Sequence, residues 1–276
     1  MIHIATVHWE TDKWIDIQQK YLQKNIHQPF RIYTFLSGKA SDHRDKFFFT
    51  STEVIREHAV KLNLLGEIIS ANAAENDPLI FIDGDAFPVN PLDNFISKTL
   101  NEYPLCAIQR LENVNDVQPH PSFCLTTVGF WRKIGGDWKE GYKWLSQANL
   151  WRTDVGGNLL KILQDNKVNW LPLHRTNSNP YHPILFGVYE NLIYHHGAGF
   201  RDPMSRYDRL KSTDEVIDNK FLAKSLDLFL STLSLKNRFR FHNILGINKR
   251  IKSKNSALSD RVYEMILQDE YFFQKI

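Results

Sequence analysis

The order of apolar segments in the first 82 residues is the feature that most constrains the fold of this chain. Residues 2–9 and 30–36 are short and β-rich, and residues 79–82 form an apolar run without alternation, as expected of a central strand covered on both faces. Between them, apolar residues recur at spacings of three and four, which predicts helices over about 11–22 and 52–75. This alternation implies right-handed crossovers and a doubly wound α/β sheet, whose ligands bind at the carboxyl ends of the strands.

The rest of the chain continues the alternation and then changes character. Further helices and strands are predicted at 92–100, 105–109, 156–165, 168–173 and 192–194. From Asp214 onward the pattern is helical and increasingly basic. A chain of 276 residues, 42% of them hydrophobic, can build one sizeable core with an appendage. We therefore predict an α/β domain over 1–205 and a helical, basic C-terminal extension over 206–276.

Composition and charge exclude several classes of protein. The formal net charge is only +3, so the chain lacks the large positive excess typical of nucleic-acid-binding proteins. The N-terminus runs directly into a predicted strand, without the basic and apolar regions of a signal peptide. No stretch reaches the roughly 18 apolar residues of a membrane-spanning helix. Cys106 and Cys124 are too few for a disulfide framework, so we expect a cytoplasmic protein with two reduced thiols.

Two carboxylates separated by a glycine follow the apolar run, as Asp83-Gly84-Asp85. Anions at the end of a buried strand repel one another unless a positive charge lies between them. A divalent cation supplies that charge, and carboxylate oxygens suit Mg²⁺ or Mn²⁺. The alternative is a solvated turn, for which Asp-Gly-Asp is also a suitable composition.

This segment resembles the metal-binding Asp-x-Asp motif of GT-A glycosyltransferases, which use nucleotide-sugar donors. The resemblance covers about residues 1–205 in pattern and order. It implies a three-layer α/β/α sandwich with a mixed, mainly parallel sheet. It also implies that Thr6, His8 and Trp9, at the end of the first strand, contact the base or ribose of the donor. Asp83 would contact the ribose and the metal, and Asp85 would ligate the metal directly.

A later segment resembles the His-x-x-Gly signature of family 8-like GT-A domains, in which the histidine completes the metal shell. His196 and Gly199 have that spacing, so His196 is the implied ligand and His195 is expected to point away, because strand side chains alternate. Gly197 and Gly199 would direct backbone N–H groups at the diphosphate, with Arg201 as a cationic partner. The family commonly has a Lys followed by Pro and Trp near this point, whereas Arg201 is followed by Asp and Pro here.

Asp154 precedes a predicted helix and occupies the place where GT-A enzymes commonly carry an acidic residue near the reacting carbon. The resemblance implies that it is the catalytic residue. Val155 stands where an Asp-Gln pair would have Gln, so the stereochemical course stays open. The alternative is that Asp154 only caps the helix.

The predicted function is transfer of a sugar from a UDP- or GDP-linked donor to a hydroxyl of a glycan or a lipid-linked acceptor, with Mn²⁺ or Mg²⁺ as cofactor, in the synthesis of surface polysaccharide. A second reading is an inactive GT-A-like module that binds a nucleotide sugar or a glycan. A third is a phosphatase of the haloacid-dehalogenase type, which also places Asp-x-Asp after an apolar strand. Ala86-Phe87 and the distance of the motif from the N-terminus argue against that class.

Residues 236–254 carry seven Lys or Arg and no acidic residue, interleaved with large apolar side chains. This composition is typical of segments that contact anionic lipid, which predicts peripheral attachment at the inner face of a membrane. A solvated helix face is the alternative. Nucleic acid is a less natural partner for this composition, and none is predicted.

Overall fold

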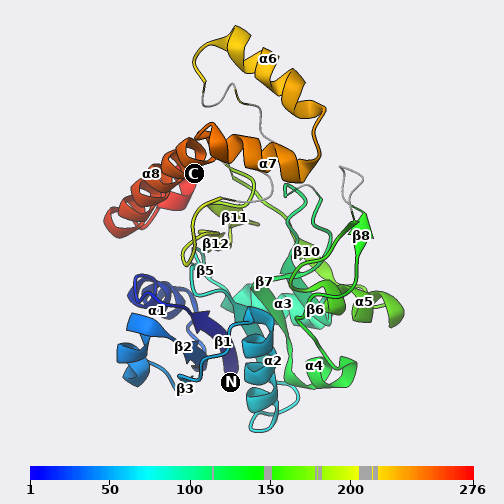
Figure 1. The fold of residues 1–276 in the computed structure, drawn as a ribbon. Helices are drawn as coiled ribbons and strands as arrows, with labels where there is room; N and C mark the ends of the chain where they lie inside the picture. The colour runs from blue at the N-terminus through cyan, green and yellow to red at the C-terminus, as the bar shows by residue number, and fades with distance from the viewer. Residues whose placement is uncertain (114, 146–150, 178, 180–181, 205–212, 214–216) are drawn as a thin grey trace. The chain divides into compact units, whose positions relative to one another are not determined.

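The computed structural model describes residues 1–113, 115–145, 151–177, 179, 182–204, 213 and 217–276 (Figure 1). The chain divides into two compact units. The first comprises residues 1–200 and 273–276, and the second comprises residues 201–272. The boundary predicted between 205 and 206 falls within 205–212, outside the described residues.

A seven-stranded sheet forms the centre of the first unit. Its order is β10-β6-β7-β4-β1-β2-β3. All neighbouring strands are parallel except β7, which is antiparallel to both β4 and β6. The strands span Ile2–His8 (β1), Phe30–Leu36 (β2), Phe49–Ser51 (β3), Pro78–Ile82 (β4), Leu105–Ile108 (β6), His120–Thr127 (β7) and Leu171–Leu173 (β10).

Helices cover both faces of this sheet, because successive side chains of a strand point to opposite sides. Ala5 and Val7 of β1 lie in one buried apolar cluster with side chains of α2, α4 and α5, whereas Ile2 and Ile4 lie in a second cluster with side chains from α1 and α3. The predicted α/β/α architecture with a mixed, mainly parallel sheet is therefore confirmed. The helices span Ile15–Asn25 (α1), His58–Ser70 (α2), Asp93–Glu102 (α3), Val128–Ile134 (α4) and Gly157–Asp165 (α5).

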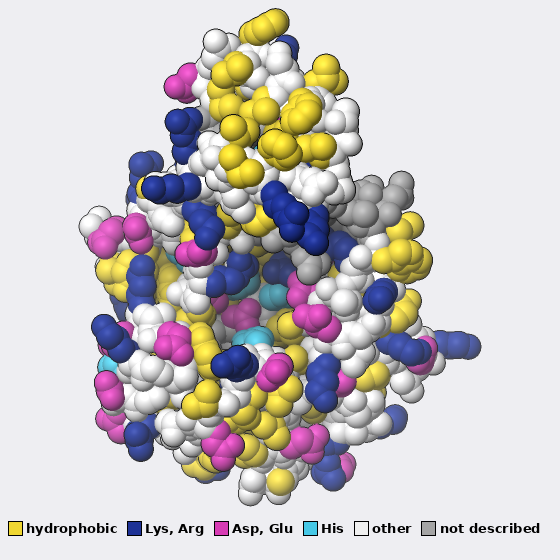
Figure 2. Space-filling model, in the orientation of Figure 1, with side chains coloured by type: hydrophobic (Ala, Val, Ile, Leu, Met, Phe, Trp, Pro, Cys, Tyr) yellow, Lys and Arg dark blue, Asp and Glu magenta, His cyan; other side chains and the backbone are white. Residues whose placement is uncertain are grey.

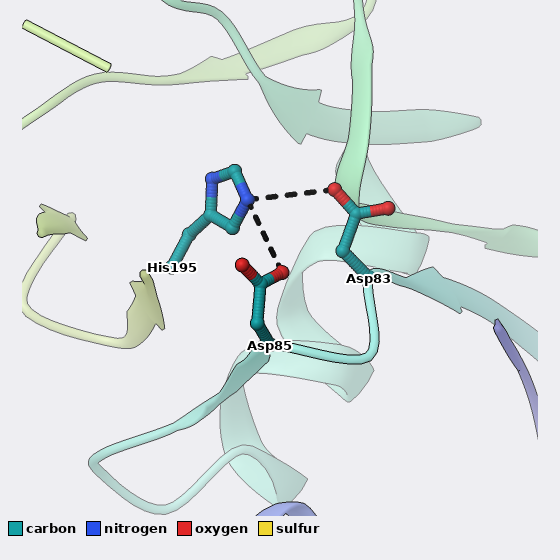
Figure 3. A group of neighbouring side chains, drawn as sticks. All are labelled: Asp83, Asp85 and His195. Atoms are coloured by element: carbon teal, nitrogen blue, oxygen red, sulfur yellow. Dashed lines mark ion pairs between the residues drawn. The ribbon is translucent and has the colours of Figure 1, made fainter. Parts of the chain in front are cut away.

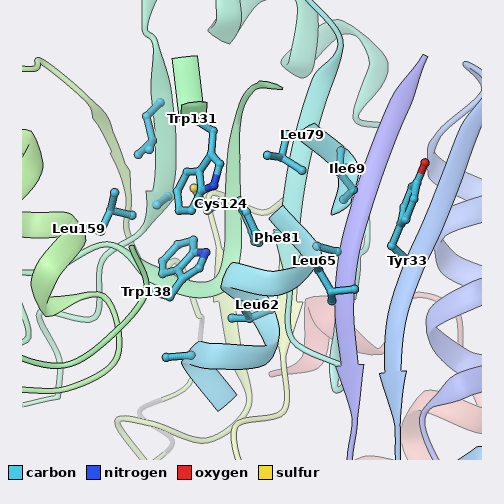
Figure 4. Close-up of a cluster of buried hydrophobic side chains, with 14 of the residues drawn as sticks. Tyr33, Leu62, Leu65, Ile69, Leu79, Phe81, Cys124, Trp131, Trp138 and Leu159 are labelled. Carbon is cyan, nitrogen blue, oxygen red and sulfur yellow. The ribbon is translucent and has the colours of Figure 1, made fainter. Parts of the chain in front are cut away.

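Phe81 lies at the centre of the first of these clusters. Its fully buried ring is 4.6 Å from the ring of Trp131 and 5.2 Å from that of Trp138, measured between centroids. Figure 4 shows Phe81 among these tryptophans and the aliphatic side chains of α2, including Leu62 and Leu65. Both cysteines are free and buried in the two clusters, as predicted.

Three short strands form a separate antiparallel sheet in the order β11-β12-β5. They span Ala86–Pro88 (β5), Gly187–Tyr189 (β11) and Ile193–His195 (β12). Since β5 follows β4 after a three-residue turn, this small sheet begins at the carboxyl end of a central strand of the large one. A further two-stranded sheet pairs Trp144–Leu145 (β8) with Trp151–Arg152 (β9).

Two helix boundaries differ from the prediction. The helix predicted from residue 52 begins at His58, because residues 49–51 instead form edge strand β3 beside β2. Val54, predicted to lie on the buried side of that helix, is therefore 82% exposed. The first helix begins at Ile15 rather than near Thr11.

The second unit contains three helices in its described part, and it supplies the helical C-terminal portion predicted from sequence. They span Lys220–Ser231 (α6), Leu235–Ile244 (α7) and Ile247–Gln268 (α8). The Asn219 side chain caps α6, and Gly246, in the left-handed conformation, separates α7 from α8. Among the residues that the structure describes, no helix combines the length and apolar character needed to cross a bilayer.

Phe81→Ala should lower the free energy of unfolding by about 3–5 kcal/mol, because it leaves a cavity between two tryptophans and a helix. Urea unfolding followed by far-UV circular dichroism measures this difference. Val54→Ala, at an exposed position, should change stability by no more than about 0.5 kcal/mol. Equal effects of the two substitutions would contradict the assignment of Phe81 to the core.

Candidate active site

Asp83 and Asp85 lie in the tight turn that joins β4 to β5. The turn closes with a hydrogen bond from the backbone N–H of Ala86 to the carbonyl of Asp83 (2.9 Å). On the other side of β5, His195 of β12 pairs with Ala86, and the N–H of His196 donates to the carbonyl of Asp85 (3.0 Å). Antiparallel pairing therefore brings a residue more than 100 positions later in the sequence to the acidic turn.

The three side chains converge on one point (Figure 3). Nε2 of His195 lies 3.5 Å from Oδ2 of Asp83 and 3.6 Å from Oδ1 of Asp85. One ligand atom from each residue lies within 4.8 Å of the other two. Asp85 and His195 are buried, and the Asp83 side chain is 15% exposed. The cluster is thus largely shielded from solvent and retains one accessible carboxylate.

The outer oxygen of each carboxylate is held by another group. His58, the first residue of α2, donates from Nε2 to Oδ1 of Asp83 (3.0 Å). The backbone N–H groups of Gly197 and Gly199 donate to Oδ2 of Asp85 (3.1 and 2.8 Å). These contacts leave Oδ2 of Asp83 and Oδ1 of Asp85 directed toward His195. Groups that hydrogen-bond to the far oxygen of a carboxylate orient it for a metal in this way.

The donor set fits a divalent cation. Two ligands bound to one Mg²⁺-sized ion at about 2.1 Å lie roughly 3–4 Å apart, close to the separations from the imidazole to the two carboxylates. Carboxylates favour Mg²⁺ and Mn²⁺, and an imidazole is a common ligand of transition metals, so the mixed set favours Mn²⁺ over Mg²⁺. Asp83, Asp85 and His195 are therefore the residues that would hold the metal.

The two histidines have the opposite placement from the prediction. His195, expected to point away, lies beside the carboxylates, whereas His196, the predicted ligand, is buried elsewhere. Nδ1 of His196 is hydrogen-bonded to the hydroxyl of Tyr194 (2.9 Å), and its ring packs 4.5 Å from that of Trp14. Neighbouring side chains of β12 do alternate, as expected. Which of the two histidines faces the carboxylates depends on how β12 pairs with β5, and the spacing between His196 and Gly199 does not reveal that pairing.

The glycines also differ from their predicted role. The N–H groups of Gly197 and Gly199, expected to face a diphosphate, donate to the Asp85 carboxylate. Side chains would not fit at either position: a Cβ on Gly197 would lie 1.9 Å from the carbonyl oxygen of Ile184, and one on Gly199 would lie 2.6 Å from the Cβ of Asp85. The glycine-rich turn therefore holds the Asp85 side chain, a candidate metal ligand, in place.

The end of β1 packs directly on the acidic turn. A Cβ on Gly84 would lie 2.4 Å from the carbonyl oxygen of Val7, so only glycine fits this contact. Gln18 of α1 donates from Nε2 to the carbonyls of Asp83 and Ala86, both at 2.8 Å. Its Oε1 accepts from Thr6 (3.3 Å) and His8 (3.2 Å). One amide side chain thus ties the first strand to both ends of the turn.

These contacts locate the three residues predicted to bind the donor base or ribose. Thr6 and His8 are fully buried, and both bond to Gln18. Trp9 is only partly buried, and the ammonium of Lys61, on α2, lies 3.9 Å from the centroid of its ring. Burial lowers the pKa of Lys61 to about 8. Trp9 is therefore the one of the three with an accessible surface for a ligand.

Burial and the neighbouring histidine side chains determine the pKa values of the groups in this site. Burial opposes the charge on Asp83, but the hydrogen bond from His58 and the charges of His58, His195 and His120 outweigh it and lower the pKa of Asp83. Burial also lowers the pKa of His120 and of His196 well below the ordinary value. Asp83 is accordingly a carboxylate at neutral pH, as a metal ligand must be.

Asp154, the predicted catalytic residue, belongs to a second group of charges. Its Oδ2 lies 3.6 Å from Nη2 of Arg110, and the side chain is 40% exposed. Arg110 also pairs with fully buried Asp116 (3.2 Å), which Arg152 contacts from the other side (3.1 Å). The resulting network holds the accessible carboxylate of Asp154 against a buried guanidinium.

His120 lies between this network and the cluster of Asp83, Asp85 and His195. Its ring centroid is 5.9 Å from that of His195, and the charges of both Arg110 and Asp83 act on its pKa. The turn after Asp154 packs on the residue before His120, since a Cβ on Gly156 would lie 2.1 Å from the carbonyl oxygen of Pro119. Asp154 and the acidic pair therefore border a common region of the first unit.

Arg201, the predicted phosphate partner, lies in the second unit. Its guanidinium donates to the carbonyl of Met204 (3.3 Å). The sequence analysis did not single out Gln18, His58 or Arg110, and it expected His195 to point away from the carboxylates. A histidine or arginine at the start of a helix or after a strand carries little signal alone, and Gln18 lies within the amphipathic pattern of a helix.

His8→Gln should weaken the dependence of stability on pH between about pH 4 and 6.5. Burial lowers the pKa of His8 from 6.5 to about 4, so across this window the unfolded chain binds a proton that the folded chain does not. Stability therefore falls as the pH is lowered, and glutamine should remove up to about 1.4 kcal/mol per pH unit from that slope. Urea unfolding at several pH values measures it, and an unchanged slope would show that His8 is not buried as a neutral ring.

Neither protein-family models nor curated proteins give a match to this chain. Similar solved structures include the galactosyltransferase LgtC in complex with donor and acceptor sugar analogues (12% identity, TM-score 0.34, 48% of this chain and 60% of that one). Others are residues 1–349 of S. aureus TarS (11%, 0.36, 50% and 50%) and the glycosyltransferase GlyE of Streptococcus pneumoniae (13%, 0.38, 62% and 44%). The chain spans less than two thirds of the length of each. At these values the similarity assigns no function, and a functional assignment has to come from the residues of the site.

Proposed function

We propose that this chain is a metal-dependent glycosyltransferase that moves a sugar from a UDP- or GDP-linked donor to a hydroxyl of a glycan or a lipid-linked acceptor. The observation that carries the proposal is the convergence of Oδ2 of Asp83, Oδ1 of Asp85 and Nε2 of His195 beside the end of β1. A bound Mn²⁺ or Mg²⁺ would supply positive charge that stabilises a diphosphate leaving group. Synthesis of a surface polysaccharide at the cytoplasmic face of a membrane would suit this reaction.

The residues around the acidic turn would bind and orient the donor. Trp9 offers a partly exposed ring for a base or ribose, and Lys61 lies over that ring. We propose that Thr6, His8 and the two glycines support donor binding indirectly, through Gln18 and Asp85. Arg201 remains a proposed partner of the phosphates.

Asp154 is proposed as the catalytic residue of the transfer step. In an inverting reaction its carboxylate would accept the proton of the acceptor hydroxyl while that oxygen bonds to the anomeric carbon. The bond from this carbon to the diphosphate breaks at the same time, and the nucleoside diphosphate leaves with the electron pair. In a retaining reaction the same carboxylate would stabilise the positive charge that develops on the sugar. Its pairing with Arg110 would orient the carboxylate in either case.

Two other functions remain to be tested against this one. An inactive module of the same fold would bind the nucleotide sugar without releasing nucleoside diphosphate. A phosphatase would use one of the two aspartates of the turn as a nucleophile. The hydrogen bonds that hold Oδ1 of Asp83 and Oδ2 of Asp85 favour fixed metal ligands over a mobile nucleophile.

Mn²⁺ should raise the melting temperature of the protein, and a UDP- or GDP-sugar should raise it further, because a ligand at a hundred times its Kd adds about 2.7 kcal/mol. His195→Ala and Asp85→Ala should abolish the increase caused by Mn²⁺. His196→Phe should lower the starting melting temperature and keep the increase, because His196 does not face the carboxylates. Asp16→Ala, on the exposed face of α1, is the matched acidic control. Loss of the increase in His196→Phe with retention in His195→Ala would contradict the assigned ligands.

Asp154→Asn should lower the rate of nucleoside diphosphate release by about 10²- to 10⁴-fold, as removal of a general base does, and should keep the thermal shift with Mn²⁺. A panel of UDP- and GDP-sugars with Mn²⁺ measures the release. Donor binding without release from any donor by the wild-type protein would favour the inactive module. Hydrolysis of p-nitrophenyl phosphate that Asp83→Asn blocks would favour the phosphatase.

A further inference from the structure

Helix α6 exposes a row of large apolar side chains. Phe221, Leu222, Leu228 and Phe229 are 83%, 56%, 74% and 50% exposed. The two pairs are seven residues apart, so they lie on one face of the helix, two turns from each other. Ala223 and Leu230, the next residue after each pair, are fully buried. The helix therefore packs with one side and presents an apolar row on another.

This row continues onto α7. The rings of Phe229 and Phe241 are in edge-to-face contact, 5.7 Å apart. One turn after Phe241, Ile244 and Leu245 are 77% and 49% exposed. We call these seven residues the α6–α7 apolar face: Phe221, Leu222, Leu228, Phe229, Phe241, Ile244 and Leu245. Figure 2 shows hydrophobic side chains gathered over this part of the second unit, with Lys and Arg side chains next to them.

Basic residues surround the apolar face almost without acidic ones. Residues 217–259 contain nine Lys or Arg and two acidic residues, the exposed Asp218 and Asp227. Both carboxylate oxygens of Asp227 accept from the backbone N–H of Thr213 (2.9 and 3.0 Å), so this charge is engaged inside the unit. Lys220 and Lys224 on α6, and Lys236 and Arg240 on α7, are exposed.

We propose that the α6–α7 apolar face inserts into the surface of a membrane that contains anionic lipid, while the neighbouring Lys and Arg contact the headgroups. Large apolar side chains rimmed by basic residues are the combination that such a surface selects, because burial of apolar area and attraction to anionic headgroups add. A second copy of the chain fits less well, because a symmetric pair would bring like charges together. The proposal does not depend on the reaction of the first unit.

The site of insertion is distinct from the segment singled out in the sequence. Four of its seven residues lie on α6, before residues 236–254, and that segment supplies cations and the last three apolar side chains. Within the segment, Ile247 and Ile251 of α8 are buried and take no part.

Co-sedimentation of the full chain with vesicles tests this proposal. The chain should bind vesicles of phosphatidylcholine with 30% phosphatidylglycerol roughly tenfold or more tightly than vesicles of phosphatidylcholine alone. This binding should weaken as the salt concentration is raised. Phe221→Asp/Leu228→Asp should reduce binding to the anionic vesicles by roughly tenfold or more, because two inserted side chains are lost and two negative charges are added. Lys236→Gln/Arg240→Gln should reduce it less and should lower its salt dependence.

Val54→Asp is the control for added charge, since it places one Asp at a residue of the first unit that is 82% exposed. Equal binding by Val54→Asp and Phe221→Asp/Leu228→Asp would overturn the proposal, as would the absence of binding to anionic vesicles by the wild-type chain. Sedimentation equilibrium without lipid gives a further outcome. A dimer that Phe221→Asp/Leu228→Asp dissociates would assign the face to self-association and would also overturn it.

Discussion

The pairing of β12 with β5 is the interaction on which the candidate site depends. It places His195 opposite Ala86 and brings the Gly197–Gly199 turn to the carboxylate of Asp85. Without it, His58 alone among these groups would offset the repulsion between the two carboxylates at the strand end. The pairing of the two strands and the glycine N–H contacts thus supply both the third candidate ligand and the orientation of the second.

The opposite side of the turn is held just as closely. Gly84 allows the end of β1 to approach it, and Gln18 bonds to the turn and to β1 at once. His58, the first residue of α2, also bonds to the turn. The acidic turn is therefore held by strand β1, by helices α1 and α2, and by the small sheet that contains β12. Side chains fixed in this way lose little freedom when a ligand binds, which favours a preorganised site over one formed by the ligand.

Sequence patterns predicted the architecture because it depends on local periodicity. Residues 30–36 and 79–82 are strands as expected, since apolar runs of this length between helical segments suit a covered sheet. The acidic pair was found by its place at a strand end. The choice between His195 and His196 could not be made, because it depends on the register between strands that are distant in sequence. Gln18 and Arg110 were missed for the same reason: their partners come together only in the folded chain.

Anomalous diffraction from crystals soaked in Mn²⁺ and UDP tests the central claim most directly. The account predicts a manganese peak bounded by Oδ2 of Asp83, Oδ1 of Asp85 and Nε2 of His195, with the diphosphate of UDP against it. A manganese ion bound by His196, an ion bound away from the acidic turn, or a nucleotide held elsewhere on the first unit would contradict it.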